Sequence, residues 1–167
     1  PHRSELPGLY NFYARTQSEP AQLQALEDQR CIFFPLFMTG FVIADLLLDN
    51  DWFGAQQIVI GSASSKTGFS TAAFIRAAGF HGAIAGLTSD KNVAFSEALG
   101  CYDRVVSYSE VGSVANEPSA YIDIAGDVEV RSRLHHSLQN NAAHTLLVGA
   151  THWDQFGQSV DGEPLPG

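Results

Sequence analysis

Short apolar runs alternate along the chain with longer segments whose apolar residues recur at helical spacing. The clearest run is Ile58-Val59-Ile60, which is typical of a strand buried on both faces. The predicted strands are 58–60, 83–87, 104–106, 120–125 and 145–149, and the predicted helices are 39–50, 69–78, 91–99 and 127–138, with a short helix within 20–28. Because strands and helices alternate with short turns, the pattern predicts an α/β, Rossmann-like three-layer domain with a mostly parallel sheet of five or more strands.

The most hydrophobic stretch is residues 31–48, CIFFPLFMTGFVIADLLL. It is barely long enough to span a bilayer, and Pro35 and Asp45 interrupt it. We therefore predict a buried element and no membrane span, with Thr39 as the N-cap of the helix over 39–50. Residues 107–119 are polar, which predicts a mobile connection with room for a short helical turn.

Residues 56–79 combine a strand, a turn of small residues and a helix, and the turn over 61–68 reads GSASSKTG. A helix N-terminus leaves backbone N–H groups unpaired and carries a partial positive charge. Small residues let an anion approach those groups. The hydroxyl and ammonium groups predicted to hold a phosphate belong to Ser62, Ser64, Ser65, Lys66 and Thr67. An ordinary strand-to-helix connection with serine as the N-cap stays open as the alternative.

The composition is that of a globular chain, with 45% apolar and 16% charged residues in 167 positions, enough for one domain with its own core. The net charge of −9 argues against DNA or RNA as a partner, although a local pocket can still bind a nucleotide. Cys31 and Cys101 provide neither a disulfide framework nor a metal-site spacing, so we expect a cytoplasmic protein without a bound metal. The sequence shows no signal peptide and begins with Pro1, which indicates a processed chain or a fragment.

A dinucleotide site is the first interpretation of the turn. Its usual fingerprint has three glycines after the first strand and a carboxylate at the tip of the second. Here Gly61 and Gly68 remain, while Thr88 and Ser89 stand at that tip with Lys91 nearby. A hydroxyl pair beside a lysine suits a 2′-phosphate better than a bare ribose, so the pattern favours NADP over NAD. A helix N-cap explains the two hydroxyls equally well, and both roles can hold at once.

Two further interpretations of the turn remain open. Gly61, Lys66 and Thr67 resemble the P-loop pattern of ATP- or GTP-binding proteins, but the glycine before the lysine is missing. Asp123 on the fourth strand would then be the magnesium ligand. Alternatively, the chain is a non-catalytic Rossmann-like module whose cofactor site has decayed, because a fold alone does not establish a function.

Longer motifs resemble a known family. The stretches FFPLFMTGF, SASSKTG, GLTSDKNVAF and ALGCYDRVVSY are similar to an uncharacterised family of bacterial and fungal proteins related to the medium-chain dehydrogenase/reductases of the quinone-oxidoreductase type. The resemblance covers residues 10–155, and SASSKTG and LGCYDRVVSY are its most specific parts. It implies the nucleotide-binding portion of an NADP(H)-dependent oxidoreductase of the quinone- or alkenal-reductase type, acting on a carbonyl or an activated double bond and compatible with a homodimer.

The resemblance also implies roles for individual residues. Residues 65–68 occupy the place of the family's Gly-Gly-Val-Gly turn, of which only Gly68 is retained. Lys91 and Tyr108 fall near the positions that meet the 2′-phosphate, and Ala125 and Gly149 fall near the ribose and nicotinamide. The full set of predicted cofactor-binding residues is Ser62, Ser64, Ser65, Lys66, Thr67, Thr88, Ser89, Lys91, Asn92, Tyr108, Ala125 and Gly149.

Reductases of this type carry a second, β-rich domain that supplies the substrate pocket, and this chain is too short to contain it. We expect residues 1–30 to be a tail or the exit from that missing catalytic domain, residues 31–155 to be the nucleotide-binding domain, and residues 156–167 to be a C-terminal loop. The competing interpretation is a non-enzymatic α/β module that pairs with a partner through its aromatic tail and residues 33–41.

The sequence assigns no catalytic residue. A Tyr-x-x-x-Lys pair is missing, and hydride transfer is the cofactor's own chemistry. His152 follows the fifth predicted strand, where it is either a contact to the nicotinamide or substrate or an ordinary loop histidine. His135 and His136 point about 100° apart on one helix, which excludes a paired metal site. Asp123 is expected to be paired in the interior, and Cys101 to pack in the core.

Overall fold

A computed structural model of the chain describes residues 8–11 and 15–149. Contacts divide the chain into two parts, Pro1–Pro35 and Leu36–Gly167, and each is described by itself. The predicted domain boundaries after residues 30 and 155 stay predictions, and the predicted loop at 156–167 lies outside the described residues.

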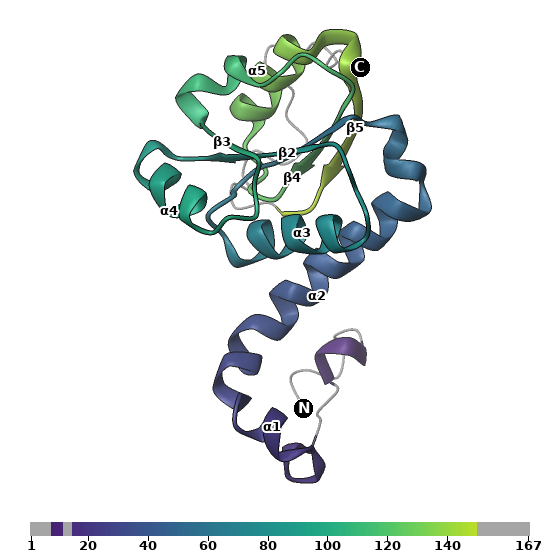
Figure 1. Cartoon of the computed structure of the whole chain (residues 1–167), viewed down its shortest axis with the longest axis vertical. Helices are drawn as coiled ribbons and strands as arrows, with labels where there is room; N and C mark the ends of the chain where they lie inside the picture. The colour runs from purple at the N-terminus through teal and green to yellow at the C-terminus, as the bar shows by residue number, and fades with distance from the viewer. Residues whose placement is uncertain (1–7, 12–14, 150–167) are drawn as a thin grey trace. The chain divides into compact units, whose positions relative to one another are not determined.

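Strands and helices alternate through the second part (Figure 1). After the end of α2 (Glu27–Asp49) come η3 (Asp51–Gly54), β1 (Gln57–Ile60), α3 (Lys66–Ala77), β2 (Ala83–Thr88), η4 (Asp90–Asn92), α4 (Val93–Ala98), β3 (Arg104–Ser107), η5 (Tyr108–Ser113), β4 (Ser119–Asp123), α5 (Val128–Leu138), η6 (Gln139–Asn141) and β5 (Ala142–Leu147). This alternation was the basis of the sequence prediction, and the structure confirms it.

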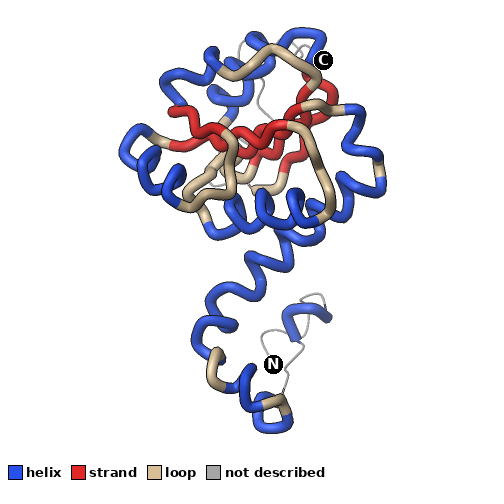
Figure 2. The backbone as a smooth tube through the Cα atoms, in the orientation of Figure 1, coloured by secondary structure: helices blue, strands red, loops and turns tan. Residues whose placement is uncertain are grey.

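The five strands form one sheet in the order β3-β2-β1-β4-β5, and every pair is parallel. β1 is central, because its Ile60 pairs with Gly86 of β2 on one side and with Ile122 of β4 on the other. Figure 2 shows these strands enclosed by helices. The predicted α/β, Rossmann-like fold with a parallel sheet is therefore confirmed. The strand order reverses between β1 and β4, and open α/β sheets bind their ligands at such a switch point.

Alternate strand residues build a core on each face of the sheet. Ile58 and Ile60 belong to a buried cluster with residues of α2 and α3, whereas Val59 belongs to a second cluster with Leu134 of α5. Helices α3 and α5 lie on opposite sides of the sheet in Figure 1. All of β1 is buried, as the apolar run predicted.

Helix α2 is longer and more exposed than predicted. It begins at Glu27 and passes through Pro35, so Thr39 is not its N-cap. Only a stripe of its residues is buried, namely Gly40, Ile43, Ala44 and Leu47. Its exposed apolar side chains in the second part are Met38, Phe41, Val42, Leu46 and Leu48. The prediction of a buried element over residues 31–48 is therefore wrong for most positions, because one face of a helix packs while the rest of its circumference does not.

The helix Glu27–Asp49 is also long and apolar enough to cross a membrane, judged by length and composition alone. However, Ile43, Ala44 and Leu47 pack in the core cluster of the second part. The buried face of this helix is therefore part of the hydrophobic core of the second part.

Several element boundaries differ from the prediction. Helix α3 begins at Lys66 rather than Phe69, because the Ser65 side chain caps it. The predicted helix over 91–99 consists of η4 followed by the shorter α4. The stretch 107–119, predicted to be a polar, mobile connection with room for a short helical turn, contains η5 as such a turn, and the buried Val111 of η5 joins the core.

The last two strands are shifted along the sequence. β4 ends at Asp123 rather than at Ala125, and β5 begins at Ala142 rather than at Thr145. Parallel pairing explains the shift of β5, because Ser119, the first residue of β4, already has Ala142 as its partner. Helix α5 agrees with prediction, with Asp127 as its N-cap.

The turn before β1 is left-handed. Residues 51–54 all have positive φ, with values between 50° and 70°, a conformation that costs about 1–2 kcal/mol for each residue other than glycine. Two ring contacts hold the turn. Trp52 packs against Phe80 with ring centroids 4.9 Å apart, and Phe53 stacks on His144 of β5 at 3.7 Å.

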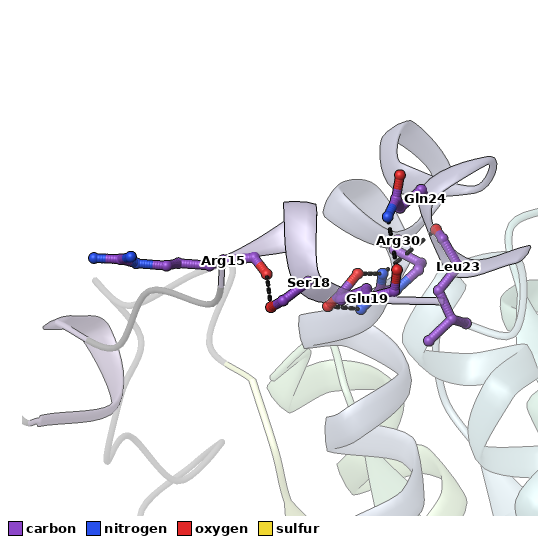
Figure 3. A network of polar contacts seen from close by, with 6 residues as sticks. All are labelled: Arg15, Ser18, Glu19, Leu23, Gln24 and Arg30. Atoms are coloured by element: carbon purple, nitrogen blue, oxygen red, sulfur yellow. Dashed lines mark hydrogen bonds and ion pairs between the residues drawn. The ribbon is translucent and has the colours of Figure 1, made fainter. Parts of the chain in front are cut away.

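The first part contains η1 (Gly8–Asn11), η2 (Thr16–Ser18), α1 (Ala21–Gln24) and the start of α2. Its main polar contact joins Glu19 and Arg30, whose guanidinium donates to both carboxylate oxygens (Figure 3). This hydrogen bond from Arg30 lowers the pKa of Glu19 below its usual value. Gln24 donates to the Glu19 carbonyl oxygen at 2.6 Å, so side chains from α1 and α2 both bond to Glu19.

A substitution at Gly40 tests how closely α2 packs against α3. A Cβ at this position would lie 2.6 Å from Ser70 Oγ and 2.9 Å from the backbone nitrogen of Thr71. We expect Gly40→Ala to lower the free energy of unfolding by about 1–3 kcal/mol, because the two helices must separate. The matched control is Gly112→Ala, whose Cβ would meet nothing within 4 Å and which should change stability by less than about 1 kcal/mol. Equal urea midpoints for the two variants would contradict this account.

Candidate functional site

The candidate site is the edge of the sheet where the strands end. The turn between β1 and α3 leaves the sheet there, and the ends of β2 and β4 flank it, because β1 pairs with both strands. Gly61 continues the ladder, since its N–H donates to the Ile122 carbonyl oxygen at 2.9 Å. This is the switch-point edge, where a parallel α/β sheet holds its ligand.

The turn itself spans residues 61–65, shorter than the predicted 61–68, because Lys66 already belongs to α3. Ser62 has a φ of 56°, a left-handed conformation that is uncommon for a residue other than glycine. Backbone bonds fix the turn: Ala63 N donates to the Leu87 carbonyl oxygen at 2.8 Å, and Ser65 N donates to the Ser62 carbonyl oxygen at 2.8 Å. The turn is therefore tied to β2 as well as to itself.

Ser65 is the N-cap of α3, since its Oγ accepts a hydrogen bond from Gly68 N at 3.0 Å. Gly68 is required there, because a Cβ would lie 2.6 Å from the Ser62 carbonyl oxygen. Ser65 is therefore the serine N-cap that an ordinary strand-to-helix connection would have. Of the other predicted residues, Lys66 is exposed and Thr67 is buried, so a ligand reaches the lysine more readily.

A cluster of hydroxyl and amide groups joins the turn to the tip of β2. The Ser64 hydroxyl accepts from Thr88 Oγ1 and from Asn92 Nδ2, each at 3.2 Å. Asn92 Nδ2 also donates to Ser89 Oγ at 3.1 Å. Four of the predicted residues therefore lie together, as expected, but their polar atoms are bonded to each other. Lys91, in η4 beside this cluster in sequence, is exposed.

Tyr108, the first residue of η5, also reaches the turn. Its hydroxyl accepts a hydrogen bond from Ser62 N at 3.0 Å. Burial raises the pKa of Tyr108, and the nearby Asp127 and Asp123 act in the same direction. The phenol therefore stays protonated at neutral pH and keeps its own proton to donate.

Ala125 and Gly149 follow the ends of β4 and β5, at the same edge of the sheet. Gly149 N donates to the Asp123 carbonyl oxygen at 3.4 Å. Only glycine fits at position 149, because the Ile124 carbonyl oxygen lies so close that a Cβ would collide with it. His152 lies outside the described residues.

Asp123 is paired in the interior, as predicted. Its side chain is fully buried, with Oδ2 accepting from Arg131 Nη1 at 2.9 Å and Oδ1 accepting from Gly126 N at 2.7 Å. Because both carboxylate oxygens are engaged, Asp123 does not match the magnesium-binding aspartate that the P-loop interpretation requires.

The two neighbouring histidines of α5 have separate partners. His135 is buried and its Nε2 lies 2.8 Å from Thr145 Oγ1, whereas His136 is exposed and its Nδ1 lies 2.7 Å from the Ser132 carbonyl oxygen. Within residues 8–11 and 15–149, no group of three or more His, Cys, Asp or Glu side chains is placed to hold a metal ion. Cys101 packs partly buried against the core, and burial raises the pKa of its thiol.

Two tyrosines at this edge were missed by the sequence analysis. Tyr102 donates its hydroxyl proton to the Ala63 carbonyl oxygen at 2.9 Å. Tyr121 of β4 places its hydroxyl against Gly61, 2.9 Å from where a Cβ would sit. Alternation along β4 could have indicated that Tyr121 and Ile122 lie on opposite faces of the sheet. No sequence pattern indicates that either phenol reaches the turn.

The strand order, the switch point and the short turn define the class of protein as a Rossmann-like α/β domain with a candidate nucleotide-binding edge. The chain belongs to the family described as "Protein of unknown function (DUF2855)", which matches residues 1–164. Comparison with curated proteins finds no match.

Several solved structures are similar at low identity. The YhdH oxidoreductase from Salmonella enterica in complex with NADP is 16% identical, with 64% of this chain and 34% of that one covered and a TM-score of 0.46. YhdH from E. coli K-12 with bound NADPH is 16% identical, with 72% and 41% covered and a TM-score of 0.47. A cobalt- and zinc-bound alcohol dehydrogenase from Pyrobaculum aerophilum is 16% identical, with 53% and 26% covered and a TM-score of 0.42. The chain spans less than half the length of each.

The tyrosines at the site, of which Tyr121 is buried and Tyr102 and Tyr108 are partly buried, generate a pH prediction. Burial is the main cause that raises the pKa of Tyr102, Tyr108 and Tyr121 above the usual value near 10. Because the unfolded chain then releases these protons at lower pH than the folded chain, stability is unaffected below pH 10 and falls as pH rises above it. We expect absorbance at 295 nm to show that three of the five tyrosines ionise only together with alkaline unfolding, followed by circular dichroism. Reversible ionisation of all five near pH 10 in the folded protein would contradict the site as described.

Proposed function

We propose that the chain is the nucleotide-binding portion of an NADP(H)-dependent oxidoreductase of the quinone- or alkenal-reductase type. The observation that carries this proposal is the position of the two lysines of the chain. In a protein of net charge −9, Lys66 directly follows the β1 turn and Lys91 follows β2, and both are exposed. Since β1 and β2 are neighbours, the two positive charges belong to one edge of the sheet. NADP(H) carries negative charge on its pyrophosphate, which binds at the turn after the first strand, and on its 2′-phosphate, which binds at the tip of the second strand.

Lys66 is suited to the pyrophosphate. It is the first residue of α3, where unpaired backbone N–H groups and the helix dipole favour an anion. The Ser65 cap and the turn position this helix end at the tip of β1. The ammonium group of Lys66 therefore adds a full charge to the partial charge of the backbone.

The tip of β2 is suited to a 2′-phosphate. A site for NAD places a carboxylate there to accept hydrogen bonds from the ribose. The nearby carboxylate belongs to Asp90, whose Oδ1 accepts instead from Ser109 Oγ of η5 at 2.9 Å. The remaining groups at this tip are the hydroxyls and amide of Thr88, Ser89 and Asn92, with Lys91 beside them. This set donates hydrogen bonds and positive charge, which supports NADP as the cofactor.

The reaction would be hydride transfer, which the nicotinamide cofactor supplies when bound. The residues of this chain would bind and orient the cofactor at the carboxyl edge of the sheet. The substrate pocket would come from a further domain of the protein, and the sequence and structure assign no catalytic side chain.

One observation favours a second candidate, a non-catalytic module whose cofactor site has decayed. Ser64 Oγ, Ser65 Oγ and Ser62 N all have hydrogen-bond partners within the protein. A ligand would have to replace some of these bonds or rely on the lysines. This candidate predicts that none of NADPH, NADH or ATP binds.

The lysines allow the two ends of the site to be tested separately. We expect Lys66→Ala to weaken NADPH and NADH alike, each by about 1–2 kcal/mol, through loss of one charge-assisted contact to the pyrophosphate. Lys91→Ala should weaken NADPH by a similar amount and leave NADH unchanged, because only NADPH carries the 2′-phosphate. Isothermal titration calorimetry of the wild type and both variants measures these affinities, and each variant is the control for the other.

Absence of NADPH binding to the wild-type chain would contradict the proposal and favour the decayed module. Equal losses for both cofactors in Lys91→Ala would remove Lys91 from the 2′-phosphate end. Magnesium-dependent ATP binding would instead support the P-loop interpretation.

A further inference from the structure

A third tyrosine at the ligand edge has no role in the site described above. Tyr121 lies in the middle of β4 and is 2% exposed, packed among the residues between the sheet and α5. Its hydroxyl and one ring edge lie against Gly61, the residue that follows β1. Gly61 has no side chain, and any Cβ there would come within 2.9 Å of the phenol oxygen. The glycine at the start of the turn thus leaves the space that the Tyr121 hydroxyl occupies.

The hydroxyl of Tyr121 has no hydrogen-bond partner among the described residues. Tyr102 and Tyr108, which reach the same turn, are both bonded, to Ala63 O and to Ser62 N. Buried phenols normally find a partner, because an unbonded polar group in the interior is costly. In the described part of the chain, one fully enclosed side-chain nitrogen or oxygen atom has no hydrogen-bond partner, and it is Ser96 Oγ. The Tyr121 hydroxyl is therefore not fully enclosed, and it lies beside Gly61, at the edge where the ligand is expected.

The surroundings of Tyr121 keep its hydroxyl protonated, so that it can donate a hydrogen bond. Burial is the main cause that raises its pKa well above the usual value, and the neighbouring Asp123 adds to the effect. Asp123 itself is engaged by Arg131 and by Gly126 N, so it is not the partner of the phenol. A neutral O–H group at the tip of β1 is suited to an oxygen that carries negative charge.

We infer that the Tyr121 hydroxyl donates a hydrogen bond to a phosphate oxygen of the ligand at the switch point between β1 and β4. This inference rests on the proposed function, because the phosphate is the pyrophosphate of the dinucleotide. In the usual fingerprint, glycines let backbone N–H groups donate to the pyrophosphate. Here the Tyr121 hydroxyl, from the neighbouring strand β4, would provide part of that hydrogen bonding. In this arrangement β4 contributes directly to cofactor binding, alongside Lys66 from α3.

The test compares a ligand that has the pyrophosphate with one that lacks it. NADPH carries both the pyrophosphate and the 2′-phosphate, whereas adenosine 2′-monophosphate keeps only the adenosine end. We expect Tyr121→Phe to weaken NADPH about tenfold, because one hydrogen bond to a charged group is lost. Adenosine 2′-monophosphate should bind the variant as it binds the wild type. Calorimetry measures NADPH, and ligand-detected NMR measures the weaker mononucleotide.

Ser96→Ala is the matched control, because it also removes one unbonded hydroxyl, in this case an enclosed one. We expect its affinity for NADPH to equal that of the wild type. Gly61→Ala is the second variant, in which the hydroxyl is present but its position is taken by a methyl group. It should also weaken NADPH and spare the mononucleotide. If Tyr121→Phe does not fold, Gly61→Ala decides the question.

The outcomes separate this inference from the function on which it rests. If the wild type binds neither ligand, the proposed function fails and the role of Tyr121 fails with it. If the wild type binds NADPH and Tyr121→Phe binds it equally well, the proposed function stands and the role of Tyr121 is overturned. A parallel loss for both ligands, or an equal loss in Ser96→Ala, also overturns it, because the effect then does not lie at the pyrophosphate.

Discussion

The pairing of β1 with a parallel neighbour on each side is the constraint on which the candidate site depends. Because Ile60 has one partner in β2 and another in β4, the two neighbouring strands end on either side of the turn that follows β1. The polar residues after β2, the tyrosine on β4 and the first residue of α3 are far apart in sequence. Pairing brings them to one edge, so the site is a property of the sheet rather than of any one motif.

The turn satisfies most of its own polar groups and still leaves donors at its surface. Ser65 caps α3, and Ser64 is bonded to the tip of β2. These bonds make the turn rigid without any ligand, which is the condition for a preorganised site. Lys66 and Lys91 are exposed at this edge of the sheet, and the Tyr121 hydroxyl lies beside Gly61. These groups are the basis of the proposal that an anionic ligand binds at this turn.

The fold was largely predictable from the sequence, because it depends on local patterns. The run Ile58-Val59-Ile60 indicates a buried strand wherever it occurs, and Asp127 is a strong N-cap by its own chemistry. The exposure of α2 was not predictable, because every side of this helix is apolar and only the tertiary packing selects the buried stripe. The start of α3 was placed too late, because the prediction began at Phe69, the first residue of the apolar periodicity, whereas the helix begins after its cap Ser65.

The candidate site was predictable only in part. Residues adjacent to strand ends, such as Ser64 and Asn92, were placed correctly because the edge of a parallel sheet follows from the order of elements. Tyr102 and Tyr121 were missed, because each reaches the turn across a strand pairing that the sequence does not state. The space beside Gly61 was not predictable either. A glycine in a turn indicates conformational freedom, but it does not indicate that the Tyr121 side chain occupies the space next to it.

The left-handed turn over residues 51–54 has a further consequence for the sheet. Its rings connect the start of β1 to β5 through Phe53 and His144, across the intervening strand β4. The amino end of the sheet is therefore clamped by aromatic stacking, while the carboxyl end is held by the polar turn. In native-state hydrogen exchange, we expect slow exchange at the clamped end and also at Gly61, Ala63 and Ser65, whose backbone N–H groups are hydrogen-bonded. β1 is therefore fixed at both ends, by stacked rings at its start and by hydrogen bonds at its tip.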